Sequence, residues 1–292
     1  MEILRYPGQE ITMPCCVTVG NFDGIHLGHR VLIDECVQFA RRHGLVSAVM
    51  TFERPPGKER LLTTPDEKKD LIAALGPDRL IILDYEEIRD WIPRKFLDFL
   101  RDEVGAKHIV SGPDHRFGRY GAGSPAMILE DTERWEIGLT VLPPLRFRGV
   151  FVKSGFVRGL IRSGAVEEAA YYLGYHYPIS GRVTEGRGIG SDIGFPTANL
   201  ITPKEKLLPA DGVYAVMAND RPAVCHIGPR FPDGEFSFEV HILDFAGDIT
   251  GQTLRVVFHK RLRDTMNFKD TEELRAHISA DVARADEYFS QI

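Results

Sequence analysis

The stretch Val17-Thr18-Val19-Gly20-Asn21-Phe22-Asp23-Gly24-Ile25-His26-Leu27-Gly28-His29-Arg30 decides the fold of the N-terminal half of the chain. Its first three residues are typical of the end of a buried strand, glycines and Asp23 supply turn residues, and helical spacing of apolar residues begins near His29. A strand, a glycine-rich turn and a helix N-terminus favour phosphate, because unpaired N–H groups and the helix dipole both attract anions. Imidazoles at His26 and His29 can donate hydrogen bonds to charge developing on phosphorus. The stretch therefore predicts phosphoryl or nucleotidyl chemistry.

Strand-like and helix-like segments alternate through residues 15–150. This alternation predicts a parallel α/β sheet, and such sheets bind ligands beyond the carboxyl ends of their strands. The histidine turn and Gly112 would lie at that edge. Further strands are expected at 45–52, 79–83, 107–112 and 139–142, and helices at 65–75 and 92–104.

The C-terminal half has a different pattern. Two short helices at 156–164 and 166–173 are followed by short strand-like runs separated by turns, which is typical of a small antiparallel barrel. These runs are 177–183, 212–217, 223–227, 236–244 and 254–260, and an amphipathic helix is expected at 271–289. We place the domain boundary near 160–178, with domains at 1–165 and 175–292.

Composition limits the classes of partner. The 36 lysines and arginines against 42 aspartates and glutamates give a net charge of −6, which argues against broad binding to nucleic acid or to an anionic membrane. No apolar run approaches the ~20 residues of a membrane span, the N-terminus has no signal-peptide pattern, and the four cysteines lack metal-ligand spacing. We expect a cytoplasmic protein without nucleic-acid or membrane partners; the sequence leaves its oligomeric state open.

A second dense motif covers residues 186–199, where a glycine cluster precedes Pro196-Thr197-Ala198-Asn199. It places a hydroxyl and an amide carbonyl after a loop large enough for phosphate, and it is not a Walker loop, since no Gly-Lys-Ser/Thr follows. Downstream, Glu239 and His241 share one face of an alternating strand. A carboxylate directed into the barrel mouth can accept the proton of an attacking hydroxyl; the alternative is a solvent-facing strand glutamate.

His26-Leu27-Gly28-His29 has the His-x-Gly-His signature of the nucleotidyltransferase superfamily. Together with residues 51–53, 112–118 and 164–170 and the motifs of the second half, the chain resembles bacterial bifunctional riboflavin kinase/FAD synthetases over nearly its whole length. The resemblance implies a Rossmann-like α/β domain that adenylylates FMN, followed by an antiparallel β-barrel domain with a C-terminal helix that phosphorylates riboflavin. ATP would be the co-substrate, Mg²⁺ the metal, and FMN and FAD the products.

The same resemblance assigns roles to individual residues. It implies catalytic roles for His26, His29 and Glu239, Mg²⁺ ligation by Thr197 and Asn199, and flavin contacts from Asp114, Arg116, Phe117 and Arg263. It implies nucleotide binding by Gly20, Asn21, Phe22, Asp23, Gly28, Lys153, Ser154 and Arg158 in the first domain, and by Gly188, Gly190, Gly194, Pro196 and Asn199 in the second.

Three segments depart from the family pattern. Arg54-Pro55-Pro56 stands where the family has Pro-His-Pro, and His226-Ile227-Gly228-Pro229-Arg230-Phe231 where it has Asn-Ile-Gly and then Arg-Pro-Thr. Lys153-Ser154-Gly155 replaces a run of three hydroxyl residues. A lysine can still meet phosphate as a point charge, but it cannot accept the hydrogen bonds of a serine.

The altered hydroxyl run leads to the hypothesis that adenylylation is weakened or lost. One alternative is therefore a riboflavin kinase with a degenerate adenylyltransferase domain. Others are a non-catalytic regulator that binds flavin or nucleotide, and a nucleotidyltransferase with a different acceptor.

Overall fold

The computed structural model describes residues 1–130, 132–185, 190 and 193–292. The chain folds as two compact units, Met1–Ser154 and Gly155–Ile292. Helices α7 (Ser154–Arg162) and α8 (Val166–Leu173) mark the start of the second unit, and α8 packs on barrel strands β9 and β14. The predicted domain limits, 1–165 and 175–292, stay a prediction.

The first unit is built on a six-stranded sheet in which every pairing is parallel, in the order β1-β4-β3-β2-β5-β6. This confirms the parallel α/β sheet. The edge strand β1 was not predicted, because five residues with only one buried side chain give little periodic signal. The strands are β1 (Glu2–Tyr6), β2 (Cys15–Val19), β3 (Val46–Phe52), β4 (Arg79–Leu83), β5 (Ala106–Ser111) and β6 (Gly138–Val141).

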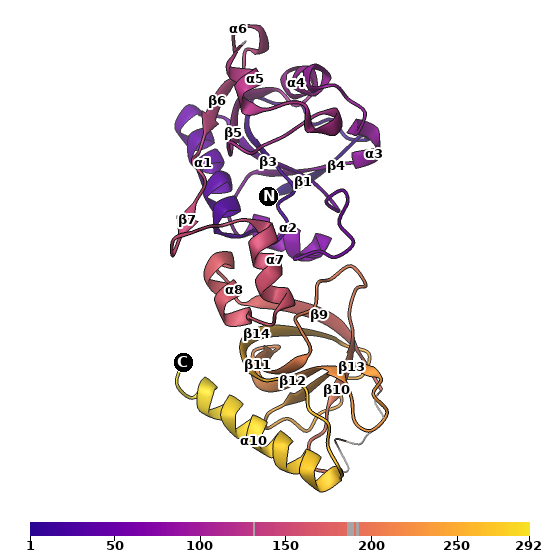
Figure 1. Cartoon of the computed structure of the whole chain (residues 1–292). Helices are drawn as coiled ribbons and strands as arrows, with labels where there is room; N and C mark the ends of the chain where they lie inside the picture. The colour runs from indigo at the N-terminus through magenta and orange to yellow at the C-terminus, as the bar shows by residue number, and fades with distance from the viewer. Residues whose placement is uncertain (131, 186–189, 191–192) are drawn as a thin grey trace. The chain divides into compact units, whose positions relative to one another are not determined.

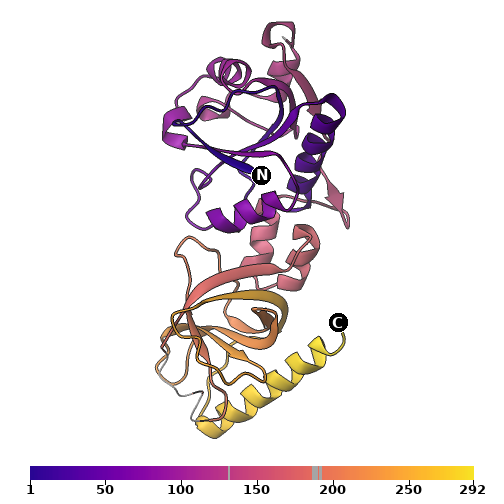
Figure 2. The ribbon, with the colours of Figure 1, turned by 180° about the vertical axis from the view of Figure 1, so that it is seen from behind.

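Helices cover both faces of this sheet (Figures 1 and 2). Successive residues of β3 point to opposite sides, so Val49 packs with Ile33 of α1 while Met50 packs with Leu97 of α4. The first face carries α1 (Leu27–His43) and α2 (Pro65–Ala73); the second carries α3 (Tyr85–Ile88), α4 (Pro93–Asp102), α5 (Pro125–Leu129) and α6 (Thr132–Trp135). Smaller elements are η1 (Arg119–Gly121) and the hairpin of β7 (Arg146–Phe147) and β8 (Val150–Phe151).

The second unit is a closed antiparallel barrel with strand order β10-β13-β12-β11-β14-β9. Aromatic side chains fill its interior: the ring centroid of Phe258 lies 5.3 Å from that of Tyr214 and 6.2 Å from that of Phe238. The predicted barrel is therefore confirmed. Its strands are β9 (Tyr177–Thr184), β10 (Ala198–Ile201), β11 (Gly212–Ala218), β12 (Arg221–Pro229), β13 (Phe236–Ile242) and β14 (Thr253–Arg263).

Helix α10 (Thr271–Phe289) covers part of the outer surface of the barrel, as Figure 1 shows in yellow. Ala285 is fully buried against Val213, Ala215 and Val224, which are the outward-facing residues of β11 and β12. The small side chain lets the helix approach the strands closely, and the predicted C-terminal helix is confirmed with the expected bounds.

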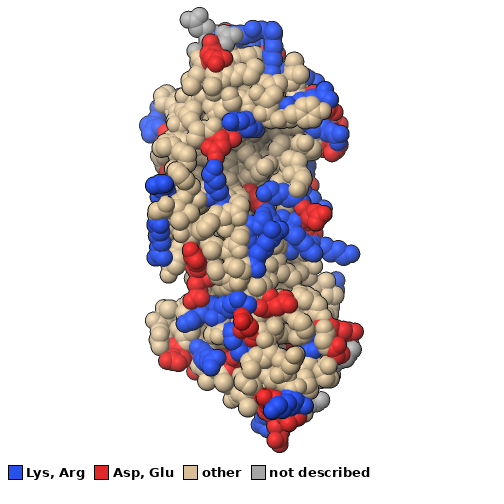
Figure 3. Space-filling view, in the orientation of Figure 1, with Lys and Arg blue, Asp and Glu red and all other residues tan. Residues whose placement is uncertain are grey.

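The surface seen in Figure 3 carries lysine and arginine interspersed with aspartate and glutamate, although basic side chains gather in one area of it. Within the described ranges, none of the helices combines the length and the apolar character needed to cross a bilayer.

The packing of α10 gives a test of the second unit. Ala285→Asp should lower the free energy of unfolding by about 3 kcal/mol or more, because it buries a carboxylate without a partner. Ala276→Asp, on an exposed position of the same helix, is the matched control and should change stability by less than about 0.5 kcal/mol. Urea denaturation of the full chain measures both; equal effects would contradict the packing described.

Candidate active sites

Strand pairing assembles the first candidate site, on the barrel. Asn199 of β10 lies directly opposite Glu239 of β13, and Ala198 lies opposite Val240. Because strand side chains alternate, Thr197 and Asn199 share a face with Glu239 and His241. The carbonyl of Pro196 lies 2.8 Å from His241 Nδ1, which fixes the segment before β10 against β13. The register thus brings the predicted residues of two separate motifs together.

Glu239 faces outward from the barrel. The alternate residues Phe238 and Val240 are 3% and 1% exposed and pack inside it, so the side chain between them projects from the outer surface. The expectation that Glu239 points into the barrel mouth is therefore wrong. Its carboxylate instead lines a pocket, here called the barrel pocket, between the outer strand surface, α10 and the flanking loops.

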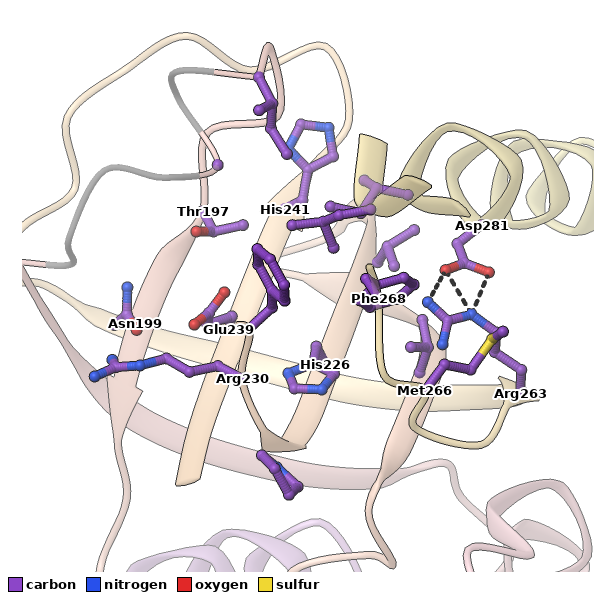
Figure 4. Close-up of a pocket in the computed structure, with 18 residues that line it drawn as sticks. Thr197, Asn199, His226, Arg230, Glu239, His241, Arg263, Met266, Phe268 and Asp281 are labelled. Atoms are coloured by element: carbon purple, nitrogen blue, oxygen red, sulfur yellow. Dashed lines mark hydrogen bonds and ion pairs between the residues drawn. The ribbon is translucent and has the colours of Figure 1, made fainter. Parts of the chain in front are cut away.

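A row of paired residues continues across the outer surface. His226 of β12 lies opposite Glu239, Val213 of β11 lies opposite His226, and Arg263 of β14 lies opposite Val213. All of them line the barrel pocket, with Asn199 and Glu239 at one side and Arg263 at the other (Figure 4).

The environment of Glu239 favours a basic carboxylate. Partial burial raises its pKa above the ordinary value, while a hydrogen bond with Ser237 and the charge of Arg230 act in the opposite direction. A carboxylate with a raised pKa that remains within reach of solvent is suited to accept a proton from a substrate hydroxyl.

Arg263 is held by a buried partner. Its Nε donates to both carboxylate oxygens of Asp281 at 3.1 and 2.9 Å, and its Nη2 lies 2.7 Å from Asp281 Oδ2. Asp281 belongs to α10 and is only 2% exposed. Arg263 therefore lines the pocket as predicted, but this pair also fixes α10 to β14.

An apolar wall faces the polar row. Phe231 and Phe268 approach edge to face at a centroid distance of 6.3 Å. Met266 follows β14, and Leu274 and Ile278 come from α10. Aromatic and aliphatic side chains with a few directed polar groups are typical of a pocket for a small organic ligand.

Gly190 and Gly194 belong to the glycine-rich motif, and both have a structural reason to be glycine. A Cβ on Gly190 would lie 2.3 Å from the carbonyl oxygen of Phe195 and 3.2 Å from Thr197 Oγ1, so only glycine fits there. Gly194 adopts φ +90°, which also favours glycine. Gly190 lines the barrel pocket, whereas Gly188 lies outside the described residues.

A second cavity adjoins the same end of the barrel and shares Thr197 with the barrel pocket. It is lined by Pro196, Phe245 and Asp248, among others. Two cavities that meet at one hydroxyl group can hold two substrates with their reacting ends at Thr197.

The donor set at this junction fits Mg²⁺. Thr197 and Asn199 offer hydroxyl and amide oxygens, which hard cations prefer. In the portion of the chain that is described, His, Cys, Asp and Glu form no group of three or more that could hold a metal. Mg²⁺ usually takes its remaining ligands from water and substrate phosphates.

The histidine turn of the first unit lines a second candidate site, here called the histidine pocket. His26 is the N-cap of α1, where its Nδ1 accepts from the backbone N–H of His29 at 3.3 Å. The two rings stack at 3.6 Å. The predicted residues that line this pocket are Gly20, Phe22, His26, Gly28, His29, Asp114, Lys153 and Ser154.

Both imidazoles are neutral near pH 7. Burial lowers the pKa of His26 to about 4 and that of His29 well below its ordinary value. His29 Nδ1 is buried and has no hydrogen-bond partner among the described residues. Neutral rings with an N–H available can donate to phosphate oxygens without carrying a charge.

Two other residues of the turn have structural contacts. The buried carboxylate of Asp23 accepts from the backbone N–H groups of Leu62 and Thr63 at 2.8 and 3.3 Å, which ties the turn to the segment before α2. Asn21 is exposed. Neither belongs to the described lining of the histidine pocket, and their roles toward nucleotide stay predictions.

Of the residues predicted from the 112–118 segment and from the helix now seen as α7, some line the histidine pocket and others do not. Phe117 is 6% exposed and packs on Phe96 at 5.5 Å in the core of the first unit. Arg116 donates to the backbone carbonyls of Pro113 and His115. Arg158 lies on α7 in the second unit. These three are absent from the described lining of the histidine pocket, and nothing tests their predicted roles.

Sequence reasoning missed His226, Arg230 and Asp281. His226 can be recognised as a pocket residue only from the strand register, which places it opposite Glu239. Asp281 had a signal of its own, because it interrupts the apolar stripe of α10 between Ile278 and Ala285, where a charge needs a partner.

Comparisons with known proteins cover both units. A family model for FAD synthetase matches residues 8–156, and one for riboflavin kinase matches residues 173–289. The bifunctional riboflavin kinase/FMN adenylyltransferase of Bacillus subtilis is 32% identical over 94% of this chain and 93% of its own. The bifunctional riboflavin kinase/FMN adenylyltransferase of Pseudomonas fluorescens is 32% identical over 93% of this chain and 92% of its own. A crystal structure of a macrolide-efflux protein from Streptococcus pneumoniae matches with a TM-score of 0.85 and 30% identity, over 96% of this chain and 97% of that one.

The chain thus combines a nucleotidyltransferase domain of the FAD synthetase type with a kinase domain of the riboflavin kinase type. It belongs to the family of bifunctional riboflavin kinases/FMN adenylyltransferases.

The pair between α10 and β14 gives a second test. Asp281→Ala should lower the free energy of unfolding by about 3 kcal/mol, because it leaves the guanidinium of Arg263 without its buried partner. The control is Arg284→Ala, since Arg284 is 57% exposed and its Nη1 lies 3.9 Å from the same carboxylate; its effect should stay within about 0.5 kcal/mol. Chemical denaturation distinguishes them, and a stability of Asp281→Ala equal to that of the unaltered protein would refute the role of the pair.

Proposed function

We propose that this protein makes both flavin cofactors from riboflavin: ATP phosphorylates riboflavin to FMN in the barrel pocket, and ATP adenylylates FMN to FAD in the histidine pocket. Membership of the family supports both reactions. The observation that carries the kinase assignment is the strand register that puts Thr197, Asn199 and Glu239 on one face of the barrel pocket, with Thr197 shared by a second cavity.

In the kinase reaction, the flavin ring lies against the apolar wall of the barrel pocket and its ribityl chain reaches Glu239. Glu239 accepts the proton of the 5′-hydroxyl as its oxygen attacks the γ-phosphorus of ATP, and ADP leaves. The cavity that shares Thr197 takes the nucleotide. Thr197 and Asn199 would hold Mg²⁺, which, when bound, neutralises phosphate charge.

In the adenylyltransferase reaction, a phosphate oxygen of FMN attacks the α-phosphorus of ATP and pyrophosphate leaves. The strand-turn-helix geometry positions the phosphates, and the neutral imidazoles of His26 and His29 donate hydrogen bonds to charge that builds on them. A Cβ on Gly28 would lie 3.2 Å from the His26 ring and 3.4 Å from the Val152 carbonyl oxygen, so glycine keeps this approach open.

One specific observation favours a kinase-only alternative. Of the family's three hydroxyl groups, this chain keeps only that of Ser154, and this hydroxyl donates to the carbonyl of Asp23 at 3.1 Å. A weaker second reaction would then let FMN accumulate.

A product time course tests these proposals. Incubation with riboflavin, ATP and Mg²⁺ should give FMN first and FAD after it, separated by chromatography. FMN that never converts to FAD would select the kinase-only alternative. A lack of both products would contradict the proposed function and leave a binding protein or a different substrate.

Glu239→Gln tests the proposed base. The variant should lower the rate of FMN formation by a factor of about 10² to 10⁴, because an amide cannot accept the hydroxyl proton. FAD formation from supplied FMN should persist, since it takes place in the other unit. Glu272→Gln, at an exposed position in the first turn of α10, is the matched control. A near-normal rate of FMN formation by Glu239→Gln would remove Glu239 as the base.

A further inference from the structure

The histidine pocket contains one ion pair that this chain owes to its departure from the family pattern. Among the described residues that line the pocket, Lys153 is the only lysine or arginine and Asp114 the only carboxylate. Lys153 Nζ lies 2.7 Å from Asp114 Oδ2. The side chain that replaces a family hydroxyl is thus neutralised by a residue of the same pocket.

No other group in this lining supplies a positive charge. The two histidines are neutral near pH 7, since burial lowers the pKa of both. The imidazole of His115, which also lines the pocket, has its pKa lowered to about 4 by burial. A nucleoside triphosphate carries several negative charges, so a nearby cation would strengthen its binding here. The cation in this pocket is the ammonium group of Lys153, which is paired with Asp114.

The ion pair can be broken at little cost. Both side chains are 59% exposed, and ion pairs exposed to this degree contribute little to stability because water and salt screen them. The long, flexible lysine side chain can move between two acceptors within its reach. The pair therefore holds the ammonium group near the pocket without locking it.

We propose that Lys153 exchanges Asp114 for the polyphosphate of the nucleotide when ATP enters the histidine pocket, so that Asp114 acts as a competitor of the phosphate. The proposal rests on the function proposed above for this pocket. It gives the lysine the contact that the missing hydroxyl groups would otherwise make. It also predicts that nucleotide affinity in this pocket falls as ionic strength rises.

Chemical labelling of the full chain tests the exchange without relying on turnover. A lysine-acylating reagent followed by peptide mass spectrometry reports the reactivity of each lysine separately. Lys153 should react in the protein alone and become protected as ATP or inorganic tripolyphosphate is added. Lys107, exposed on β5 and absent from the described pocket linings, should react equally throughout.

Variants test whether the positive charge of Lys153 is what strengthens ATP binding. Lys153→Met should raise the ATP concentration that half-saturates FAD formation by about tenfold or more, whereas Lys153→Arg should stay within about threefold. Asp114→Asn should lower the ATP concentration that half-protects Lys153 by about threefold, because the competing carboxylate is gone. Lys107→Met is the matched control for loss of an exposed lysine and should change neither value.

The outcomes separate this proposal from the proposed function. Protection of Lys153 by ATP without any FAD product supports the exchange and contradicts adenylylation. FAD formation with Lys153 labelled equally at saturating ATP overturns the exchange and leaves adenylylation standing. A Lys153→Met variant with an unchanged ATP requirement, or an Asp114→Asn variant that needs more ATP to protect Lys153, also overturns it.

Discussion

The register of β10 against β13 is the constraint on which the barrel pocket depends. It sets Asn199 opposite Glu239, and the same ladder continues through His226 and Val213 to Arg263. If β13 shifted by one residue against its neighbouring strands, Glu239 would point into the barrel and Val240 out to solvent, because side chains alternate along a strand. The buried residues Phe238 and Val240 prevent that slip. Packing inside the barrel therefore determines which side chains line the barrel pocket on its outer surface.

The fold followed from the sequence wherever periodicity was strong. The parallel sheet, the barrel and the bounds of α10 are confirmed. These features could be predicted because each depends on a local sequence pattern that tertiary packing reinforces. Strands β1 and β10 were missed for a common reason. Each is short, and each is stabilised by neighbours that are distant in sequence rather than by its own pattern.

The candidate sites were predicted less completely. Motif residues such as Thr197 and Glu239 could be named individually, but their position in one pocket depends on strand pairing across about forty residues of intervening chain. The outward direction of Glu239 matches the alternative of a solvent-facing strand glutamate, and the apolar residues Phe238 and Val240 on either side were the signal for it. Asp23 shows the opposite difficulty: it lies within a functional motif, yet its carboxylate caps backbone N–H groups of a neighbouring segment.

The ion pair of Arg263 and Asp281 also bears on the order in which the second unit is completed. During synthesis Arg263 emerges from the ribosome 18 residues before its partner. Until Asp281 and the rest of α10 have been made, the guanidinium of Arg263 lacks its carboxylate partner. The outward-facing Val213 and Val224 remain exposed to solvent during that time. The apolar surface formed by Val213, Ala215 and Val224 is therefore covered only by residues that are translated later, so the barrel exposes it until α10 has been made.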